Sequence, residues 1–368
     1  MRVLQISSAR NFGGGEKHLV DLCRGLKRRG HEVLVALRPT NKWQERFDFL
    51  APENFLHVSI RNSFGVFSAQ RIAEFVREND IQIIHAHVAR DYIPASLACR
   101  IAKTPRLVLT RHVLFPMKPF HKFALKNVSK VIAVSGAAAE SLETIFPKEK
   151  IRVVPNGIEI EKRAGAGYGE KLRREFRSEH NIPCDAALIG VVGELKLLKG
   201  QRDFVLAAKI IAEKFPQAHF IIVGKDNSAN QSFRNELKRL VKIFNLENRF
   251  LWLNWVEETA PLLQALDVFV SPSHSESFGL AILEAMASGT AIAAAETEGA
   301  KEILRDGETA LLVPVQQPVA LAAAIDRLLT DENLRARLGG QARDFAAVNF
   351  SLERMIDETE KVYREQIV

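Results

Sequence analysis

Two glutamates separated by seven positions have the clearest potential for chemistry in the chain. Glu276 precedes a predicted helix over 278–287, and Glu284 lies within that helix. A helical stretch of this length rises about 12 Å, at about 1.5 Å per residue. The two carboxylates could therefore contact opposite ends of an extended ligand with a diphosphate between them. On spacing alone, a solvated helical glutamate is the simpler interpretation of Glu284.

The start of the same predicted helix offers hydrogen-bond donors. We expect Ser277 to cap it, and the amides of a first helical turn have no partner inside the helix. These amides belong to Phe278, Gly279 and Leu280. An anion or a sugar hydroxyl is the expected ligand of such donors.

Two other loops connect a predicted strand to a predicted helix. The loop over 11–16 includes Gly14 and Gly15, and its glycines allow the backbone to approach a phosphate closely. Its spacing matches neither a dinucleotide fingerprint nor a P-loop, so a plain tight turn stays open. In the second loop, Lys199 precedes Gly200 and can reach a phosphate, although a lysine at such a place is often only a surface charge.

Histidines in the first half of the chain invite a metal interpretation. His85 and His87 lie on one face of a predicted strand, because side chains alternate along a strand. No third ligand accompanies them at a suitable spacing, so we expect no metal. A structural role stays open for both, and so does a ligand pocket made by His87 with Arg90 and Tyr92.

Composition and length limit the class of protein. The 368 residues are 47% hydrophobic and 26% charged, which is typical of a globular protein with two domains. The three cysteines, Cys23, Cys99 and Cys184, lie far apart, which excludes a disulfide scaffold and zinc-ligand spacing. The N-terminal residues lack the pattern of a signal peptide, and no apolar stretch is long enough to span a membrane, so we expect a cytoplasmic protein.

The positive charge is concentrated in the first half. Residues 1–163 carry 27 Lys and Arg against 15 Asp and Glu, a net charge of +12, whereas the remainder carries a net charge of −5. Between positions 100 and 130, cations alternate with Leu114, Phe115, Phe120 and Phe123. This segment is either a solvated face or a surface that docks peripherally on an anionic membrane. No nucleic-acid-binding module is visible, so we expect no nucleic-acid partner.

Short apolar runs alternate with amphipathic helical patterns along the whole chain. Such runs are typical of parallel strands covered on both faces. In the first half they cover 3–6, 33–37, 81–86, 107–110, 131–134 and 152–154. In the second half they cover 187–192, 220–223, 250–253, 267–271, 290–294 and 311–313. The alternation predicts an α/β fold of two Rossmann-like, doubly wound domains.

A Gly- and Ala-rich stretch over 162–169 separates the two alternations, and we place the interdomain linker there. The predicted domains are 1–165 and 166–349. An amphipathic pattern over 352–364 must cover an apolar surface. At the end of the first helix, Lys27, Arg28 and Arg29 are interpreted as a solvated helix end.

The loops and the glutamate pair described above, together with the segments named at the end of this paragraph, resemble the family 4 retaining glycosyltransferases of the GT-B fold, also called glycosyl transferases group 1. The most specific match is the Glu-x7-Glu segment with its Phe-Gly-Leu, and the resemblance spans nearly the whole chain. The other matching segments are 11–16, 84–87, 110–112, 131–135, 154–157, 199–200 and 299–314.

The resemblance implies an enzyme that moves a hexose or N-acetylhexosamine from a nucleoside diphosphate sugar to a glycan or a lipid-linked glycan. It implies two domains facing each other across a cleft, 1–165 for the acceptor and 166–349 for the nucleotide sugar. The last helix, about 350–368, would pack back on the first domain. A UDP-sugar is favoured and a GDP-sugar stays open. No metal is required, because cations and helix dipoles stabilise the leaving group. The expected setting is cell-envelope glycan biosynthesis on the cytoplasmic side of the membrane.

The resemblance also assigns roles to residues. Glu284 would hold the ribose, and Glu276 with the three amides named above would hold the sugar and the distal phosphate. Lys199 and the Gly14-Gly15 backbone would neutralise the diphosphate. His112 would lie beside the transferred sugar, and the acceptor would contact His87, Arg90, Tyr92 and Arg111. Catalysis would depend on His112, Glu276 and Lys199.

One position departs from the family pattern. An arginine commonly follows the glycine after the strand, but this chain has Glu194, so either Lys196 substitutes or Glu194 turns outward. Losing one charge-assisted phosphate contact, about 1.5–3 kcal/mol, would slow transfer about ten- to a hundredfold. Gly224 and Lys225 also replace the family's Asp-Gly. A nucleotide-sugar-binding protein with a decayed site and a GT-B sugar epimerase therefore stay open as alternatives.

Overall fold

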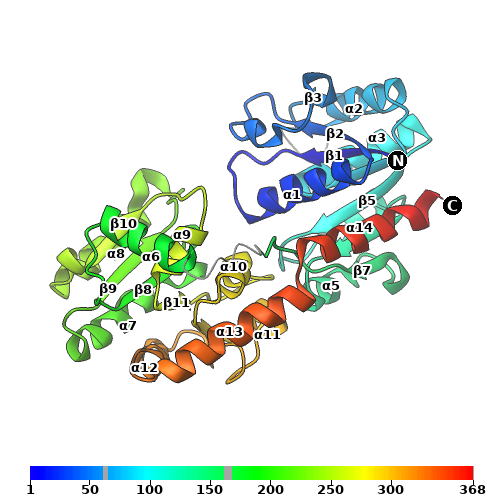
Figure 1. Ribbon diagram of the computed structural model, residues 1–368. Coiled ribbons are helices and arrows are strands. Elements are labelled where there is room, and N and C mark those ends of the chain that lie inside the picture. The colour runs from blue at the N-terminus through cyan, green and yellow to red at the C-terminus, as the bar shows by residue number, and fades with distance from the viewer. Residues whose placement is uncertain (61–64, 161–167, 368) are drawn as a thin grey trace. The chain divides into compact units, whose positions relative to one another are not determined.

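The computed structural model describes residues 1–60, 65–160 and 168–367 (Figure 1). The chain divides into two compact units. Unit 1 comprises Met1–Gly157 and Leu352–Val368, and unit 2 comprises Ile158–Ser351. Of the stretch predicted as the linker, residues 162–167 lie outside the described residues. Tyr168 and Gly169, which were also assigned to the linker, instead begin a helix.

Within the described residues, unit 1 contains a seven-stranded sheet in the order β3-β2-β1-β4-β5-β6-β7, with every pair parallel. The strands are β1 (Arg2–Ser7), β2 (Glu32–Leu37), β3 (Phe55–His57), β4 (Ile83–Ala86), β5 (Arg106–Arg111), β6 (Lys130–Ala133) and β7 (Ile151–Val153). The sequence predicted all of them except β3, which has three residues at the sheet edge.

Helices cover both faces of this sheet, so most of its strands read as continuous apolar runs. They are α1 (Gly14–Arg28), α2 (Val66–Glu78), α3 (Tyr92–Ala102), α4 (His121–Ala124), α5 (Gly136–Leu142) and α14 (Leu352–Ile367). Leu4 and Ile6 of β1 pack into a core shared with α2, α3 and α5. Val3 packs on the opposite face with α1 and α14.

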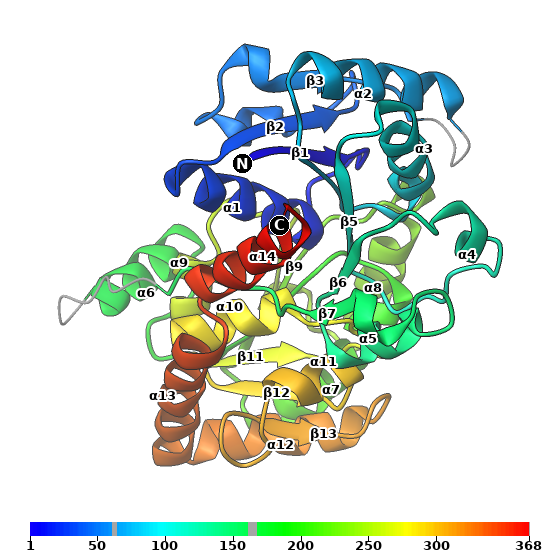
Figure 2. The same ribbon diagram turned by 90° about the vertical axis from the view of Figure 1, so that its right-hand side faces the viewer.

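The last helix returns to unit 1 and lies beside α1 (Figure 2). A Cβ atom on Gly25 of α1 would lie 2.1 Å from the Cδ1 of Ile356, so the two helices approach closely there. Arg29 forms ion pairs with Glu353, Asp357 and Glu360 of α14 at 2.6, 2.6 and 3.1 Å. The interpretation of Arg29 as part of a solvated helix end was therefore wrong, because its partners come from the far end of the chain.

Unit 2 contains, among its described residues, a six-stranded parallel sheet in the order β10-β9-β8-β11-β12-β13. Its strands are β8 (Leu188–Val192), β9 (His219–Val223), β10 (Phe250–Leu253), β11 (Val268–Ser271), β12 (Ile292–Ala295) and β13 (Leu311–Val313). Its helices are α6 (Tyr168–Glu179), α7 (Gln201–Lys214), α8 (Ser232–Ile243), α9 (Ala260–Ala265), α10 (Leu280–Ser288), α11 (Glu298–Ile303), α12 (Pro318–Thr330) and α13 (Glu332–Asn349). Two doubly wound parallel sheets confirm the predicted fold class.

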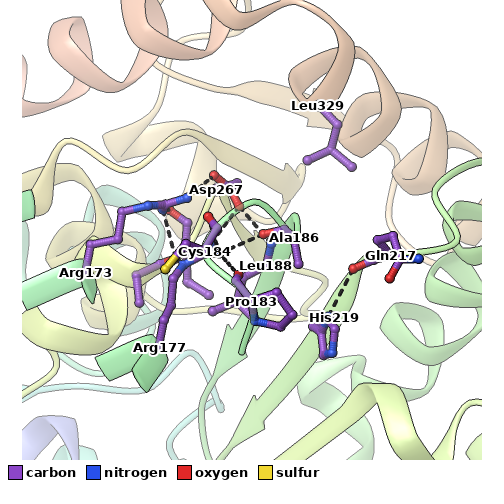
Figure 3. A network of polar contacts seen from close by, with 12 residues as sticks. Arg173, Arg177, Pro183, Cys184, Ala186, Leu188, Gln217, His219, Asp267 and Leu329 are labelled. Carbon is purple, nitrogen blue, oxygen red and sulfur yellow. Dashed lines mark hydrogen bonds and ion pairs between the residues drawn. The ribbon is translucent and has the colours of Figure 1, made fainter. Parts of the chain in front are cut away.

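A buried network attaches α6 to the sheet of unit 2 (Figure 3). The guanidinium of Arg177 bonds to Asp267 at 2.9 Å and donates to the carbonyl oxygens of Ala265 and Ala186 at 2.9 and 2.7 Å. Asp267 also pairs with Arg173 at 2.8 Å and accepts from the amide of Leu188 in β8. Both oxygens of Asp267 and all three nitrogens of the Arg177 guanidinium have partners in this network, so its role is to stabilise the unit.

Candidate active site

The strongest candidate site in unit 2 lies at the carboxyl ends of β8 and β11. The chain order of the strands reverses between these two neighbours, and ligands of open α/β sheets bind at such a point. Lys199 ends a short turn after β8, and Glu276 lies in the loop after β11. The Nζ of Lys199 forms an ion pair with the Oε2 of Glu276, to which Ser273 also donates at 3.4 Å. The two residues predicted as catalytic in this unit therefore meet.

Close backbone approaches hold both loops in place. Gly200 has a φ of +65°, and a Cβ atom there would lie 1.9 Å from the carbonyl oxygen of Pro272. The amide of His274 donates to the carbonyl of Leu198 at 2.9 Å. On the other side, the amide of Gly299 donates to the carbonyl of Glu276 at 3.0 Å. Only glycine fits at Gly200, and the loop of Glu276 is fixed from two directions.

The helix after Glu276 begins later than predicted. α10 starts at Leu280, because Gly279 adopts a left-handed conformation with a φ of +97°. Ser277 does not cap the helix, since Gly279 is the N-cap residue and no side chain bonds there. Among the described residues, no acceptor receives a bond from the amides of Phe278, Gly279 and Leu280. These donors stay available to a ligand, although only the third belongs to the helix.

Glu194, which stands where the family commonly has an arginine, is held by its neighbours. Its carboxylate pairs with Lys196 at 2.8 Å and accepts from the Nδ2 of Asn227 at 2.9 Å. Burial acts to raise the pKa of Glu194, but these two hydrogen bonds and the charges of Lys196 and Lys199 hold that pKa below its ordinary value. Lys196 therefore neutralises Glu194, and in this arrangement Lys199 is the cation that faces Glu276.

Unit 1 brings histidines together at the ends of its central strands. His87 follows β4, His112 follows β5, and His18 comes from the first turns of α1. The ring centroids of His18 and His112 are 4.9 Å apart, and those of His18 and His87 are 5.8 Å apart. A Cβ atom on Gly15 would lie 3.9 Å from the ring of His112. The glycine loop and His112 are thus neighbours.

The sequence analysis missed His18. Its signal was present, because His18 lies four residues after Gly14 and shares a helix face with it. One ligand atom from each of His18, His87 and His112 lies within 4.8 Å of the others, a group that could hold a metal ion. The sequence offered no third ligand at a suitable spacing from His85 and His87. The fold nevertheless brings His18 and His112 close to His87.

Burial keeps these histidines neutral. Desolvation lowers the pKa of His18 to about 4 and lowers those of His85, His87 and His112 well below 6.5. His85 has both nitrogens occupied, by the hydroxyls of Tyr363 at 2.6 Å and Thr110 at 2.7 Å. It therefore fulfils the structural role that the sequence left open, and it connects α14 to the sheet.

Unfolding should depend on pH through this cluster. The unfolded state binds a proton on His18 below pH 6.5, whereas the native state does so only near pH 4, so stability falls as the pH drops through that window. The difference corresponds to about 3 kcal/mol for His18. Asp91 opposes this trend below pH 6, because burial raises its pKa to about 6. We expect His18→Gln to flatten the pH dependence of urea unfolding, and His57→Gln, at an exposed histidine, to leave it unchanged.

The remaining predicted acceptor residues differ in their environments. Tyr92 is buried, and its hydroxyl donates to the carbonyl of Thr110 at 2.6 Å. Arg111 is buried and donates to the carbonyl of Phe115. Arg90 is exposed at the same edge of the sheet, after β4. Of these three side chains, Arg90 is the one that extends into solvent.

Comparison with known proteins assigns the class. The C-terminal half, residues 173–345, matches the family described as glycosyl transferases group 1. The N-terminal half, residues 12–162, matches the family described as glycosyltransferase family 4. The chain belongs to this family of glycosyltransferases, which confirms the resemblance drawn from the Glu-x7-Glu segment.

Individual relatives extend over most of the chain. An N-acetyl-alpha-D-glucosaminyl L-malate synthase of Bacillus anthracis is 27% identical, over 96% of this chain and 94% of its own length. A phosphatidyl-myo-inositol mannosyltransferase of Mycolicibacterium smegmatis is 26% identical, over 88% and 83%. The fold resembles the crystal structure of Anabaena Alr3699/HepE in complex with UDP-glucose, with a TM-score of 0.86, 22% identity and coverage of 99% and 100%. The protein is therefore a glycosyltransferase of the GT-B fold.

Proposed function

We propose that this protein transfers a hexose or N-acetylhexosamine from a nucleoside diphosphate sugar, with a UDP-sugar favoured, to a glycan or lipid-linked glycan. The observation that carries the proposal is the Lys199–Glu276 pair at the switch point of unit 2, beside free backbone amides. The UDP-glucose in the Anabaena structure supports the choice of donor.

Each group has a role in this proposal. Glu284, half-buried in α10, accepts from the ribose hydroxyls, and Glu276 accepts from the sugar hydroxyls. Lys199 and the amides from Phe278 to Leu280 stabilise the diphosphate as negative charge develops on it. In unit 1, His112 lies beside the transferred sugar, and the Gly14-Gly15 backbone contributes amides to the phosphates.

The anomeric configuration is retained by attack on the face from which the diphosphate departs. The bond from the anomeric carbon to the diphosphate oxygen breaks while the acceptor oxygen bonds to that carbon. The acceptor proton passes to the departing phosphate oxygen, so no enzyme carboxylate needs to form a covalent intermediate. Glu276 and Glu284 are therefore not an acid and nucleophile pair of the glycosidase kind.

Metal independence can be tested directly, because His18, His87 and His112 could hold an ion. We expect dialysis against EDTA to leave the rate of transfer unchanged within about twofold, since Lys199 and the backbone amides supply the positive charge. A loss of activity that Mg²⁺, Mn²⁺ or Zn²⁺ restores would contradict this expectation. The measurement is the initial rate before and after chelation, with bound metal counted by mass spectrometry.

The acceptor and its location form the finer part of the proposal. Phe115, Phe120 and Phe123 are 66%, 40% and 84% exposed, and Lys118 and Lys122 are exposed among them. Aromatic rings beside cations suit the surface of an anionic membrane, so we propose peripheral docking on the cytoplasmic face. None of the helices in the described residues combines the length and hydrophobicity that a membrane crossing requires. Co-sedimentation with anionic vesicles, lost in Phe123→Ser, tests this docking.

The experiment for the reaction is release of labelled sugar from a panel of UDP- and GDP-sugars, first in water and then with acceptors. Slow hydrolysis of one donor and faster transfer from it are expected. Tight donor binding without turnover would instead indicate a binding protein with a decayed site. A changed sugar that still carries its nucleotide would indicate an epimerase. No binding and no turnover with any donor would overturn the proposal.

A further inference from the structure

A second set of polar groups lies at the carboxyl ends of β1, β2 and β4 in unit 1. Ser7 pairs in register with Leu37, and Ile6 pairs with Ala86, so the residues that follow these strands meet at one edge. The amide of Ser8 donates to the Oδ2 of Asp91 at 2.8 Å. Because the strand order reverses between β1 and β4, this edge is the point where open α/β sheets bind ligands.

Arg38 follows β2 at this edge and is buried, with Asp91 as a nearby opposite charge. Its residue is 8% exposed, and within the described part of the chain its side chain makes no hydrogen bond and no ion pair. A buried charge without a partner is costly, so such a group is normally paired or bound to a ligand. Burial and the charges of Arg10 and Arg90 lower the pKa of Arg38, and the charge of Asp91 offsets them only in part.

Other buried polar atoms at this edge also lack partners among the described residues. The clearest is the Nδ2 of Asn41, and the Oγ of Ser8 and the Oδ1 of Asp91, which lie beside each other, form no hydrogen bond of good geometry. Asn41 is held next to Arg38, since its amide donates to the Arg38 carbonyl at 3.0 Å. Native proteins satisfy most buried polar groups, so several unsatisfied groups at one edge indicate the place of a ligand.

The charges indicate the chemistry of that ligand. Three guanidinium groups and one carboxylate give the edge a net charge of +2, and Arg10 and Arg90 are exposed. A phosphate monoester carries about −1.5 to −2 at pH 7, and guanidinium groups bind phosphate with two parallel hydrogen bonds. A monocarboxylate would leave an excess positive charge.

We propose that this edge binds a phosphoryl group of the acceptor, held by Arg38 with Arg10, Arg90 and the Nδ2 of Asn41. Asp91 and Ser8 then bond to hydroxyl groups of the same molecule. The inference rests on the proposed function, because it names the acceptor class of that transferase. The phosphoryl group belongs either to a water-soluble phosphate ester or to a lipid headgroup.

The probes are inorganic phosphate, glycerol 3-phosphate, and phosphatidylcholine vesicles with or without about 20% phosphatidylinositol. Binding is measured by calorimetry and co-sedimentation on the full chain, with and without UDP. We expect Arg38→Met to weaken binding of the phosphate ester about ten- to a hundredfold. Arg71→Met, at an exposed arginine on α2 of the same unit, should leave it unchanged. Preference for the soluble ester or for the phosphatidylinositol vesicles identifies the source of the phosphoryl group.

A second readout separates a ligand role from a structural one. Replacing a buried, unpaired charge by an apolar side chain should raise the Tm of the ligand-free protein, by about 2 °C or more. A structural arginine would lower it. The proposal is overturned if no phosphoryl probe binds, if Arg38→Met binds them as the wild type does, or if it lowers the Tm. If the wild type binds the phosphoryl probes but does not bind UDP, the result contradicts the proposed donor site and not this inference.

Discussion

Lys199→Ala lowers kcat/KM for sugar transfer by about a hundred- to a thousandfold, the loss expected for one preorganised group that stabilises charge in a transition state. Lys199 is the cation that contacts Glu276, and Lys196 is already paired with Glu194 at 2.8 Å. The variant therefore loses positive charge at the leaving group. It also leaves the carboxylate of Glu276 without its counter-ion in a half-buried loop.

The measurement separates kcat from KM with the donor that the wild type uses. Most of the loss should appear in kcat, because the charge on the diphosphate grows as the glycosidic bond breaks. Lys209→Ala is the matched control, since Lys209 is an exposed lysine on α7 of the same unit. An effect of less than about fivefold on kcat/KM would show that Lys199 is not part of the catalytic machinery.

Arg177→Met destabilises unit 2 by about 3–5 kcal/mol, the range measured when one partner of a buried ion pair is removed. The side chain of Arg177 is 1% exposed. Its removal deprives the carbonyls of Pro183 and Ala186 of this donor, leaves the Ala265 carbonyl with Arg173 at 2.9 Å, and weakens the neutralisation of Asp267. Arg173 still pairs with Asp267 at 2.8 Å, which keeps the loss from being larger.

Urea unfolding followed by circular dichroism measures this effect. Arg174→Met is the control, because its side chain is 68% exposed and contacts Glu170 at 4.0 Å, so its loss should cost less than about 0.5 kcal/mol. If the free energy of unfolding of Arg177→Met lies within about 1 kcal/mol of the wild-type value, the network does not attach α6 to the sheet as its geometry indicates.

Most of the fold could be predicted from the sequence because both faces of each sheet are buried. The apolar runs over 250–253 and 311–313 coincide with β10 and β13. β3 was missed, since it is short, lies at the edge and has a half-buried Phe55 and an exposed His57. The start of α10 was misplaced because the positive φ of Gly279 depends on the loop packed around it and not on local propensity.

The candidate site was predicted only in part, for a related reason. Loops after adjacent parallel strands meet at one edge, so the proximity of Lys199 and Glu276 follows from the fold class. The grouping of His18 with His112 depends on how α1 packs, and the ion pairs of Arg29 depend on the return of α14. The pairing of Glu194 with Lys196 and Asn227 required side-chain geometry across two loops.

The most direct measurement is calorimetric titration of the preferred nucleotide sugar into the wild type and into the double variant Glu276→Gln, Glu284→Gln. We predict at least about a hundredfold weaker binding, because two carboxylate contacts to sugar and ribose hydroxyls are lost at opposite ends of one ligand. Glu213→Gln, at an exposed glutamate on α7, should bind as the wild type does. Equal dissociation constants for the wild type and the double variant would contradict the assignment of the donor to this site.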